Sequence, residues 1–442
     1  MKRTILFVLC LFFVSALLFA GGGQEKEAVQ EGAVEQEAAV EKSTVELFWH
    51  MTEYETWLRE TMKPIFEKEN PDIELKITFV NDPENEAVLS SRLAADNLPD
   101  IFAVIGGTAV VALQEDKLLD ISQYPDIMTN LDNYPKNLFD FPRNVREKHG
   151  MEPTGIYGWP TFKVMTGLFY DKNLFASNGF EPPATYDEFW DLCEAMSKTD
   201  VYEKPIAWGN HRWLVFNNFW QVATALAGPD VSSRLMSGDL KFNDPVILEV
   251  WDYYKRIADN NYADLNYKSK EWGLLESDFA NLKYGMILQG PWLFNSYPKM
   301  NPDIELGVVP FPTKDGKNRH WVGFVGDRNW WVSKNATDSR EAQLKVVEWM
   351  TGPDYADHMI QDANLLPFYQ KKYNVESPVI TEMDAKGFPV APQANNQLDV
   401  LIPAGNPSFY SFVWENLNKL TNEGMSVKEF GDMVENFYGQ FR

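Results

Sequence analysis

The sequence alternates between strand-like and helix-like segments, and this alternation is the feature that most limits the possible folds. The first expected strands cover residues 45–49, 73–80 and 100–105. The helical patterns between and after them cover residues 56–69, 86–95 and 110–116, and Pro64 is expected to kink the first of these helices. A β-α-β-α-β series of this kind favours a largely parallel sheet covered by helices.

The same alternation returns in the second half of the chain. Residues 167–170 read as a strand, and Thr185 and Glu188 have the spacing of a capping box that opens a helix. Cys193 falls on the apolar face of that helix, so it is expected to be a small buried side chain and not a nucleophile. A strand at 329–332 is followed by a helix at 339–351, which should stop at Gly352. The simplest account is two α/β lobes with a cleft between them.

The N-terminus has the pattern of an export signal. A short basic segment, an apolar run of ~15 residues and small residues after it predict a signal peptide over residues 1–20, because a membrane span needs ~20 apolar residues. Cys10 lies inside the apolar run, where a lipidation motif would have a small residue before the cysteine, so lipidation remains the less favoured alternative. Residues 21–43 are acidic, contain few large apolar side chains and are expected to form a disordered tether. Cleavage would leave one cysteine, and therefore no intrachain disulfide.

Composition excludes several classes of function. The formal net charge is -24, which argues against a nucleic-acid partner because phosphate binding requires a basic face. The five histidines lack the spacing of a metal site, and the sequence has no Walker A, GxSxG or HExxH motif. We therefore expect no metal, no cofactor and no enzymatic activity, in a chain long enough for roughly two domains.

Glycines, single polar groups and tryptophans recur just after the expected strands, where open α/β sheets bind their ligands. The stretch GMILQGPWLF is the clearest case. Gly290 and Pro291 should end a strand there and turn the chain so that Trp292 projects into the cleft. Trp330 and Trp331 are adjacent, so in a strand they must face opposite sides of the sheet, and the sequence leaves open which one faces the cleft.

Six short segments, in order, resemble the substrate-binding proteins of bacterial ABC importers, in the extracellular solute-binding group that includes maltose-binding protein. They are RLAADNLPDIFAV with LQEDKLLDIS, GIYGWPTFKVMTGLFYDKNLF, EPPATYDEFW, QGPW, WWVSKNATDSREAQLKVVEWMTGPD and LLPFYQ. The resemblance extends over residues 44–440. It implies the two-lobed periplasmic-binding-protein fold of type II, with mixed sheets flanked by helices and a hinged cleft.

The resemblance also implies a division of the chain and a function. One lobe would contain residues 44–158 and 324–370, and the other residues 159–323 and 371–442. The chain would cross between them near 157–161 and 321–325, and a third time near 369–373. The lobes would close on a sugar or oligosaccharide and deliver it to a membrane permease. Trp292 falls where the family stacks an aromatic ring on a sugar, and Tyr410 falls near another such position. Gly107, Thr108 and Val164 stand where maltose-binding protein has charged contacts, which argues against maltose itself as the ligand.

The chemistry of the residues agrees with a sugar ligand, because a pyranose presents apolar faces and a rim of hydroxyls. The candidate ligand-binding residues are Trp292, Asp327, Tyr410, Trp213, Trp49, Glu53, His50, Lys163, Gly107, Thr108, Arg328 and Phe368. Each also has a purely structural interpretation. The tryptophans can be core residues, Asp327 can be a helix cap or an ion-pair partner, and Arg328 can be a solvated surface residue.

Two other functions remain open at this point. The same fold can bind an oligopeptide, a polyamine or a metal chelate, although a polyamine would need several carboxylates in the cleft. An exported glycoside hydrolase would need two carboxylates on either side of the scissile bond, and Glu53 and Asp327 are the candidates. We expect a monomer that is periplasmic or associated with the cell envelope.

Overall fold

The structure of this protein is a computed structural model that describes residues 42–442 except 81–83, 105–106, 209–211, 265–269, 271, 325–328, 374, 376, 394–397, 399–400 and 403–405. The expected signal peptide lies outside the described residues, as does the expected tether apart from its last two positions. No helix in the described part of the chain is long and apolar enough to cross a membrane.

A first sheet contains five strands in the order β2-β1-β3-β10-β4. Their bounds are β1 Ser43–Trp49, β2 Ile73–Phe79, β3 Ile101–Val104, β4 Gly158–Pro160 and β10 Asn329–Val332. The predicted parallel arrangement holds for β1 with β2 and for β1 with β3. Strand β10, which comes from far along the chain, enters antiparallel between β3 and β4 and makes the sheet mixed.

A second sheet has the order β11-β9-β5-β7-β6, and β8 also pairs with β5. Its strands are β5 Val164–Asp171, β6 Lys204–Ile206, β7 Tyr284–Gln289, β8 Leu306–Val309, β9 Trp321–Phe324 and β11 Val390–Gln393. Strands β6 and β7 run parallel, whereas β5 runs antiparallel to β7, β8 and β9. The expectation of mixed sheets is therefore confirmed for both sheets.

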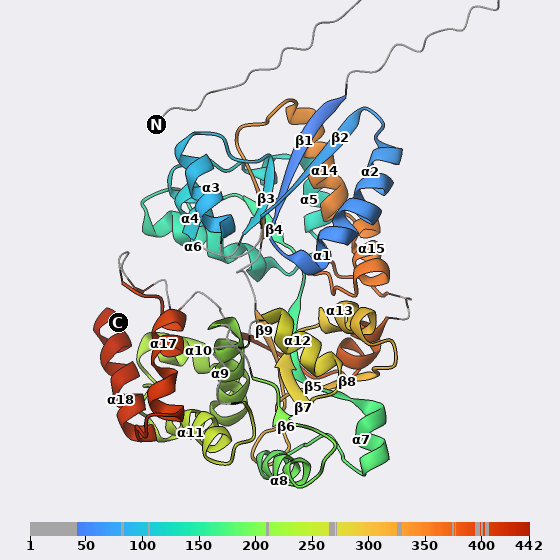
Figure 1. Cartoon of the computed structure of the whole chain (residues 1–442). Helices are drawn as coiled ribbons and strands as arrows, with labels where there is room; N and C mark the ends of the chain where they lie inside the picture. The colour runs from blue at the N-terminus through green and yellow to red at the C-terminus, as the bar shows by residue number, and fades with distance from the viewer. Residues whose placement is uncertain are drawn as a thin grey trace, which may run out of the picture. The chain divides into compact units, whose positions relative to one another are not determined.

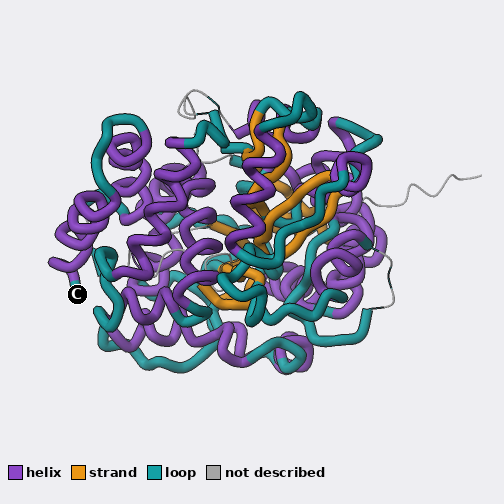
Figure 2. Tube along the Cα trace, turned by 90° about the horizontal axis from the view of Figure 1, so that it is seen from below, coloured by secondary structure: helices purple, strands orange, loops and turns teal. Residues whose placement is uncertain are grey.

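Helices cover both sheets, as Figures 1 and 2 show. Those grouped with the first sheet are α1 Thr52–Trp57, α2 Lys63–Glu69, α3 Glu84–Ala94, α4 Gly107–Gln114, α5 Pro125–Leu131, α6 Asp140–Lys148, α14 Arg340–Thr351 and α15 Pro353–Ala363. Those grouped with the second sheet are α7 Lys172–Asn178, α8 Tyr186–Ser197, α9 Arg212–Ala227, α10 Val231–Ser237, α11 Pro245–Asp259, α12 Trp272–Ala280, α13 Leu293–Met300, α17 Phe409–Thr421 and α18 Val427–Tyr438.

The local sequence explains how several helices begin and end. The capping box at Thr185 and Glu188 forms as predicted at the start of α8. The predicted helix over 56–69 is interrupted by a π-helical turn at Leu58–Met62, in which the amide of Lys63 donates to the carbonyl of Leu58. Pro64 has no amide hydrogen for the carbonyl four residues earlier, which is the physical reason for an interruption at this point.

The chain passes between the sheets three times. The first crossing covers residues 161–163 and the second lies between β9 and β10. The third follows α15 and leads to β11. Leu366 in the third crossing forms an isolated antiparallel bridge with Lys163 in the first crossing. The amide of Lys163 donates to the Leu366 carbonyl at 2.6 Å. Two crossing segments are thus hydrogen-bonded to each other.

Side chains of the first sheet pack into separate apolar clusters on its two faces. Trp330 stacks on Trp49 with ring centroids 4.9 Å apart, in the larger cluster. Trp331 lies in the smaller cluster with Phe48. Both adjacent tryptophans are therefore core residues on opposite faces. Cys193 is also buried as expected, and its burial raises the pKa of the thiol well above the ordinary value.

Candidate ligand-binding site

The segments that follow β6 and β7 lie at the same edge of the second sheet, because these strands are parallel neighbours. Strand β7 ends at Gln289, Gly290 and Pro291 form a turn, and Trp292 is the N-cap residue of α13. After β6 the chain leads to α9, whose second residue is Trp213. Two of the predicted aromatic residues are thus brought to one edge.

The Trp292 indole folds back over Gly290. A Cβ atom added to Gly290 would lie 2.7 Å from Cε3 of Trp292 and closer still to two other ring carbons. Trp292 is only 3% exposed. The Gly-Pro break therefore makes room for the ring beside the backbone, whereas the sequence had suggested a side chain that projects outward.

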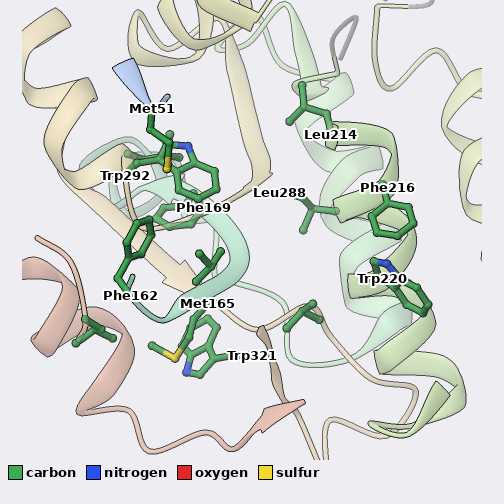
Figure 3. Packing of buried hydrophobic residues seen from close by; sticks show 14 of the residues in the cluster. Met51, Phe162, Met165, Phe169, Leu214, Phe216, Trp220, Leu288, Trp292 and Trp321 are labelled. Carbon is green, nitrogen blue, oxygen red and sulfur yellow. The ribbon is translucent and has the colours of Figure 1, made fainter. Parts of the chain in front are cut away.

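Trp292 belongs to a group of three tryptophans. Its ring centroid is 5.2 Å from that of Trp213 and 6.4 Å from that of Trp272, and the latter two are 5.7 Å apart. We call Trp213, Trp272 and Trp292 the indole cluster. Trp213 and Trp272 remain partly exposed. Figure 3 shows Trp292 with Phe169 and other buried side chains of the larger core cluster.

Buried amide side chains connect α9 to the end of β7, beside the indole cluster. Asn217 in α9 donates through Nδ2 to the Leu288 carbonyl at 3.0 Å, and Gln221 donates through Nε2 to Asn217 Oδ1 at 3.3 Å. At the end of β7, the amide of Gly290 donates to Oε1 of Gln289 at 3.2 Å. Buried amides that are hydrogen-bonded hold their elements in one arrangement, so α9 and the turn that carries Trp292 are fixed relative to each other.

Tyr410 lies near this site through α9. It is the second residue of α17, and its ring packs against Phe216, one helical turn after Trp213. Tyr410 is partly exposed, unlike Phe216. Helix α9 therefore links the predicted aromatic residues. It contains Trp213, which contacts Trp292, and Phe216, which contacts Tyr410.

The predicted residues of the first sheet are more deeply engaged in protein contacts. Trp49 packs on Trp330 and its Nε1 donates to the Met51 carbonyl at 2.8 Å. His50 is buried, and its Nδ1 donates to the Ala103 carbonyl at 3.0 Å. Contact of Trp49 and His50 with a ligand stays a prediction, because the structure shows only their packing roles.

A carboxylate that the sequence analysis missed lies at the N-terminus of α4. Oε1 of Glu86 accepts from the amide of Thr108 at 2.5 Å and from its hydroxyl at 2.7 Å. Thr108 is itself buried and also hydrogen-bonds Ser90. The second oxygen, Oε2, is buried and has no hydrogen-bond partner among the described residues.

The remaining predicted residues lie at the crossings or outside the described part. Lys163 is part of the first crossing, and burial lowers the pKa of its ammonium group while Asp384 partly opposes that shift. Phe368 is buried two residues after Leu366. Asp327 and Arg328 lie outside the described residues. Only the backbone is described for Gly107, at the start of α4, and for Glu53, in α1.

Trp272 is the second residue that the sequence analysis missed. It opens α12, and a short turn joins α12 to β7. Because the chain reverses at that turn, the start of α12 and the end of β7 must lie at the same end of the pair. This hairpin-like connection was the signal that would have placed Trp272 beside Trp292.

Other features of the described residues lie away from these side chains. Two surface hollows of about 740 and 550 Å³ are lined by the 197–205 and 313–320 regions with their neighbours, and neither contains a predicted site residue. The described residues hold no cluster of three or more histidine, cysteine or acidic side chains suited to a metal ion.

Comparison with known proteins agrees with this fold. The multiple sugar-binding protein of Streptococcus mutans is 25% identical over 324 residues, which is 70% of this chain and 71% of that protein. RafE, from Streptococcus pneumoniae, is 21% identical in its complex with raffinose, with a TM-score of 0.70 and coverage of 90% of this chain and all of that chain (100%). A sugar transporter from Bacillus licheniformis in complex with stachyose is 20% identical, with a TM-score of 0.66 and coverage of 90% and 100%.

The family assignment comes from a further match. The two solved structures establish the fold alone at these identities, and the fold is that of two-lobed binding proteins. A profile of the family described as bacterial extracellular solute-binding proteins matches residues 61–386. This match covers well over half of the sequence and includes strands of both sheets. The chain therefore belongs to the bacterial extracellular solute-binding protein family.

Proposed function

We propose that this protein is the carbohydrate receptor of an ABC importer, and that it binds a sugar or oligosaccharide beside the indole cluster. The observation that carries the proposal is the convergence of Trp213, Trp272 and Trp292 at the sheet edge where α/β proteins bind ligands. Flat aromatic faces match the apolar faces of a pyranose, and by analogy with aromatic pairs each contact would contribute ~0.5–1.5 kcal/mol beyond area burial.

The relatives support this class of ligand. The S. mutans relative is named for several sugars, and solved structures of the same fold hold raffinose, stachyose and cycloalternan. Another is a chitin oligosaccharide binding protein. These ligands differ in their linkages and ring substituents but share hydroxyl rims around apolar faces. An oligosaccharide is therefore the first class of ligand to test.

We place the ligand between two lobes, residues 44–158 with 324–370 and residues 159–323 with 371–442. One hydrogen bond supports a ligand position near both lobes. Asn295 in α13 comes only three residues after Trp292. Its Nδ2 donates to the carbonyl of Ala363 in α15 at 2.8 Å. In the first lobe, the Glu86 carboxylate would accept a hydrogen bond from a hydroxyl of the ligand. If the ligand brings the lobes together, small-angle scattering will show a smaller radius of gyration with sugar than without it.

The remaining parts of the proposal concern location and partners. The protein acts outside the cytoplasm, in the periplasm or attached to the cell envelope, as a monomer that delivers its ligand to permease subunits. It binds no nucleic acid and does not cleave its ligand. Reducing sugar released from an oligosaccharide panel by the purified protein would contradict the last statement and favour the glycoside hydrolase alternative.

The proposal is tested by titrating the protein with raffinose, stachyose and chitin oligosaccharides, followed by calorimetry and thermal unfolding. A true ligand at a hundredfold excess over its dissociation constant stabilises the folded state by about 2.7 kcal/mol. Trp213→Leu should weaken binding by roughly two- to tenfold, because it removes a partly exposed ring of the cluster.

Trp220→Leu is the matched control in the same helix. Trp220 is fully buried and lies seven residues after Trp213, outside the indole cluster. It should cost stability but leave the dissociation constant of the remaining folded protein unchanged. Equal loss of affinity in both variants, or tight binding of an oligopeptide or a polyamine in place of any sugar, would contradict the proposed function.

A further inference from the structure

A network of charged side chains joins the segment before α12 to the end of that helix and to the start of β7. The Asp278 carboxylate accepts from Lys270 Nζ and from Lys283 Nζ, each at 2.8 Å and each through a different oxygen. Lys270 Nζ also donates to the hydroxyl of Tyr284 and lies 3.7 Å from Asp264. We call these five residues the α12 charge network.

The two lysines of the network are not equivalent. The Lys270 side chain is 15% exposed and has three partners, whereas that of Lys283 is 44% exposed and hydrogen-bonds Asp278. Burial raises the pKa of Asp278, but the two ammonium groups outweigh burial and hold that pKa below its usual value. A largely buried lysine with this many partners is restricted to one position. If its side chain moved away, the buried charges of the lysine and of its acidic partners would be unpaired.

The position of Lys270 in the chain gives the network a consequence for the indole cluster. Lys270 comes two residues before Trp272, which is the first residue of α12, whereas Lys283 comes after α12 has ended. Asp278 lies in the last turns of the same helix. The Lys270–Asp278 ion pair therefore ties the chain that enters α12 to the helix body.

We propose that Lys270 is a positioning residue for the ligand site. Through Asp278 and Tyr284 it fixes where α12 begins, and so it fixes the Trp272 indole against Trp213 and Trp292. Lys270 itself need not touch the ligand. The expected effect on ligand affinity rests on the proposed function, whereas the expected effect on the arrangement of the indoles does not.

Circular dichroism of the free protein tests the arrangement without a ligand. Indoles with centroids less than about 6 Å apart couple their electronic transitions and give a paired positive and negative signal. Trp272→Phe defines the part of this signal that depends on Trp272. Lys270→Met should lose most of the same part, and Lys270→Arg should restore it, because arginine keeps a charge that reaches Asp278.

Lys283→Met is the matched control, since it removes the other cation from the same carboxylate at 2.8 Å. It should leave the indole signal at the wild-type value. Tyr284→Phe removes one hydroxyl only, and it provides a milder variant, with a partial loss of the signal expected, should Lys270→Met fail to fold. An unchanged signal in both Lys270→Met and Tyr284→Phe, or an equal loss in Lys283→Met, would overturn the proposal.

Titration with raffinose and stachyose supplies the second measurement. Lys270→Met should weaken binding by roughly two- to tenfold, which is the value of one oriented aromatic contact, and Lys283→Met should leave it unchanged. Unchanged affinity in Lys270→Met would overturn the role of Lys270 in the ligand site. If the wild-type protein binds neither these sugars nor others while the dichroism follows the expected pattern, the positioning role stands and the proposed function fails.

Discussion

Gly290 and Gly273 allow the geometry of the indole cluster to be tested by one added methyl group at each of two places. At Gly290 an added Cβ would overlap the Trp292 ring, with Cε3 only 2.7 Å away. Real Cβ atoms do not approach other atoms so closely, so the ring or the β7–α13 turn must move. Forcing a methyl group into a packed site costs about 1–3 kcal/mol. Gly290→Ala should therefore lower the free energy of unfolding by about this amount.

Gly273 is the matched position with the opposite expectation. It is the second residue of α12, directly after Trp272, and a Cβ added there would have no atom within 4 Å apart from its chain neighbours and the backbone of its own helix. Alanine is favoured over glycine inside a helix by roughly 0.5–1 kcal/mol. Gly273→Ala should therefore raise the free energy of unfolding, even though both substitutions add the same group to the same region.

Urea unfolding followed by tryptophan fluorescence measures the stability of both variants. Titration with a sugar that the wild-type protein binds measures the effect of each substitution on the site. Gly290→Ala should also shift the fluorescence of the folded protein and weaken sugar binding, because the indole that it displaces is part of the cluster. Gly273→Ala should do neither. If Gly290→Ala is as stable as the wild type, with unchanged fluorescence, the Trp292 ring does not lie over the backbone as described.

Three further predictions concern other parts of the fold. Burial raises the pKa of Glu46, but the hydrogen bonds from Arg92, at 2.7 Å, and from Thr78, together with the Arg92 charge, outweigh burial and hold that pKa below its usual value. The ionised carboxylate therefore stabilises the fold above the unfolded pKa. Glu46→Gln should lower the free energy of unfolding by about 1.5–3 kcal/mol at pH 7, and denaturation curves should show this difference shrinking as the pH falls below 4.5. Cys193 should react with a thiol reagent only as fast as the protein unfolds, because the side chain is fully buried and its raised pKa keeps it protonated; rapid labelling under native conditions would contradict its placement. Thr185→Ala removes the cap of α8, in which the Glu188 amide donates to Thr185 Oγ1, and should cost about 1 kcal/mol in the same assay.

The elements that local chemistry determines were predictable from the sequence. The strands β1 and β2, the capping box at Thr185 and the burial of Cys193 follow from short patterns of apolar and polar residues. The place of β10 was not predictable in this way. Its pairing of Trp331 with Phe102 joins residues that are distant in the chain, and a short buried strand reads the same in the middle of a sheet as at an edge.

In the candidate site too, local sequence predicted some features, whereas others depend on contacts between distant parts of the chain. The Gly-Pro sequence predicted a break after β7, but not the side to which the Trp292 ring turns. That depends on the space left by Gly290, which only the packed structure reveals. Trp272 was missed because no strand precedes it. Both missed residues lie in the first turn of a helix, Glu86 in α3 and Trp272 in α12.

The three indoles of the cluster differ in exposure, and this difference predicts different roles for them in stability and in ligand binding. Three tryptophans open to water would be costly in the unliganded protein, and their edge-on contacts with each other shield part of that apolar surface from solvent. Trp292 is buried beneath the other two indoles in contact with both, while Trp213 and Trp272 keep partly exposed faces for a ligand. Substitution of Trp292 should therefore reduce stability and affinity together. Substitution of Trp213 or Trp272 should reduce affinity more than stability, so a plot of the two quantities across the cluster separates the support from the contact surface.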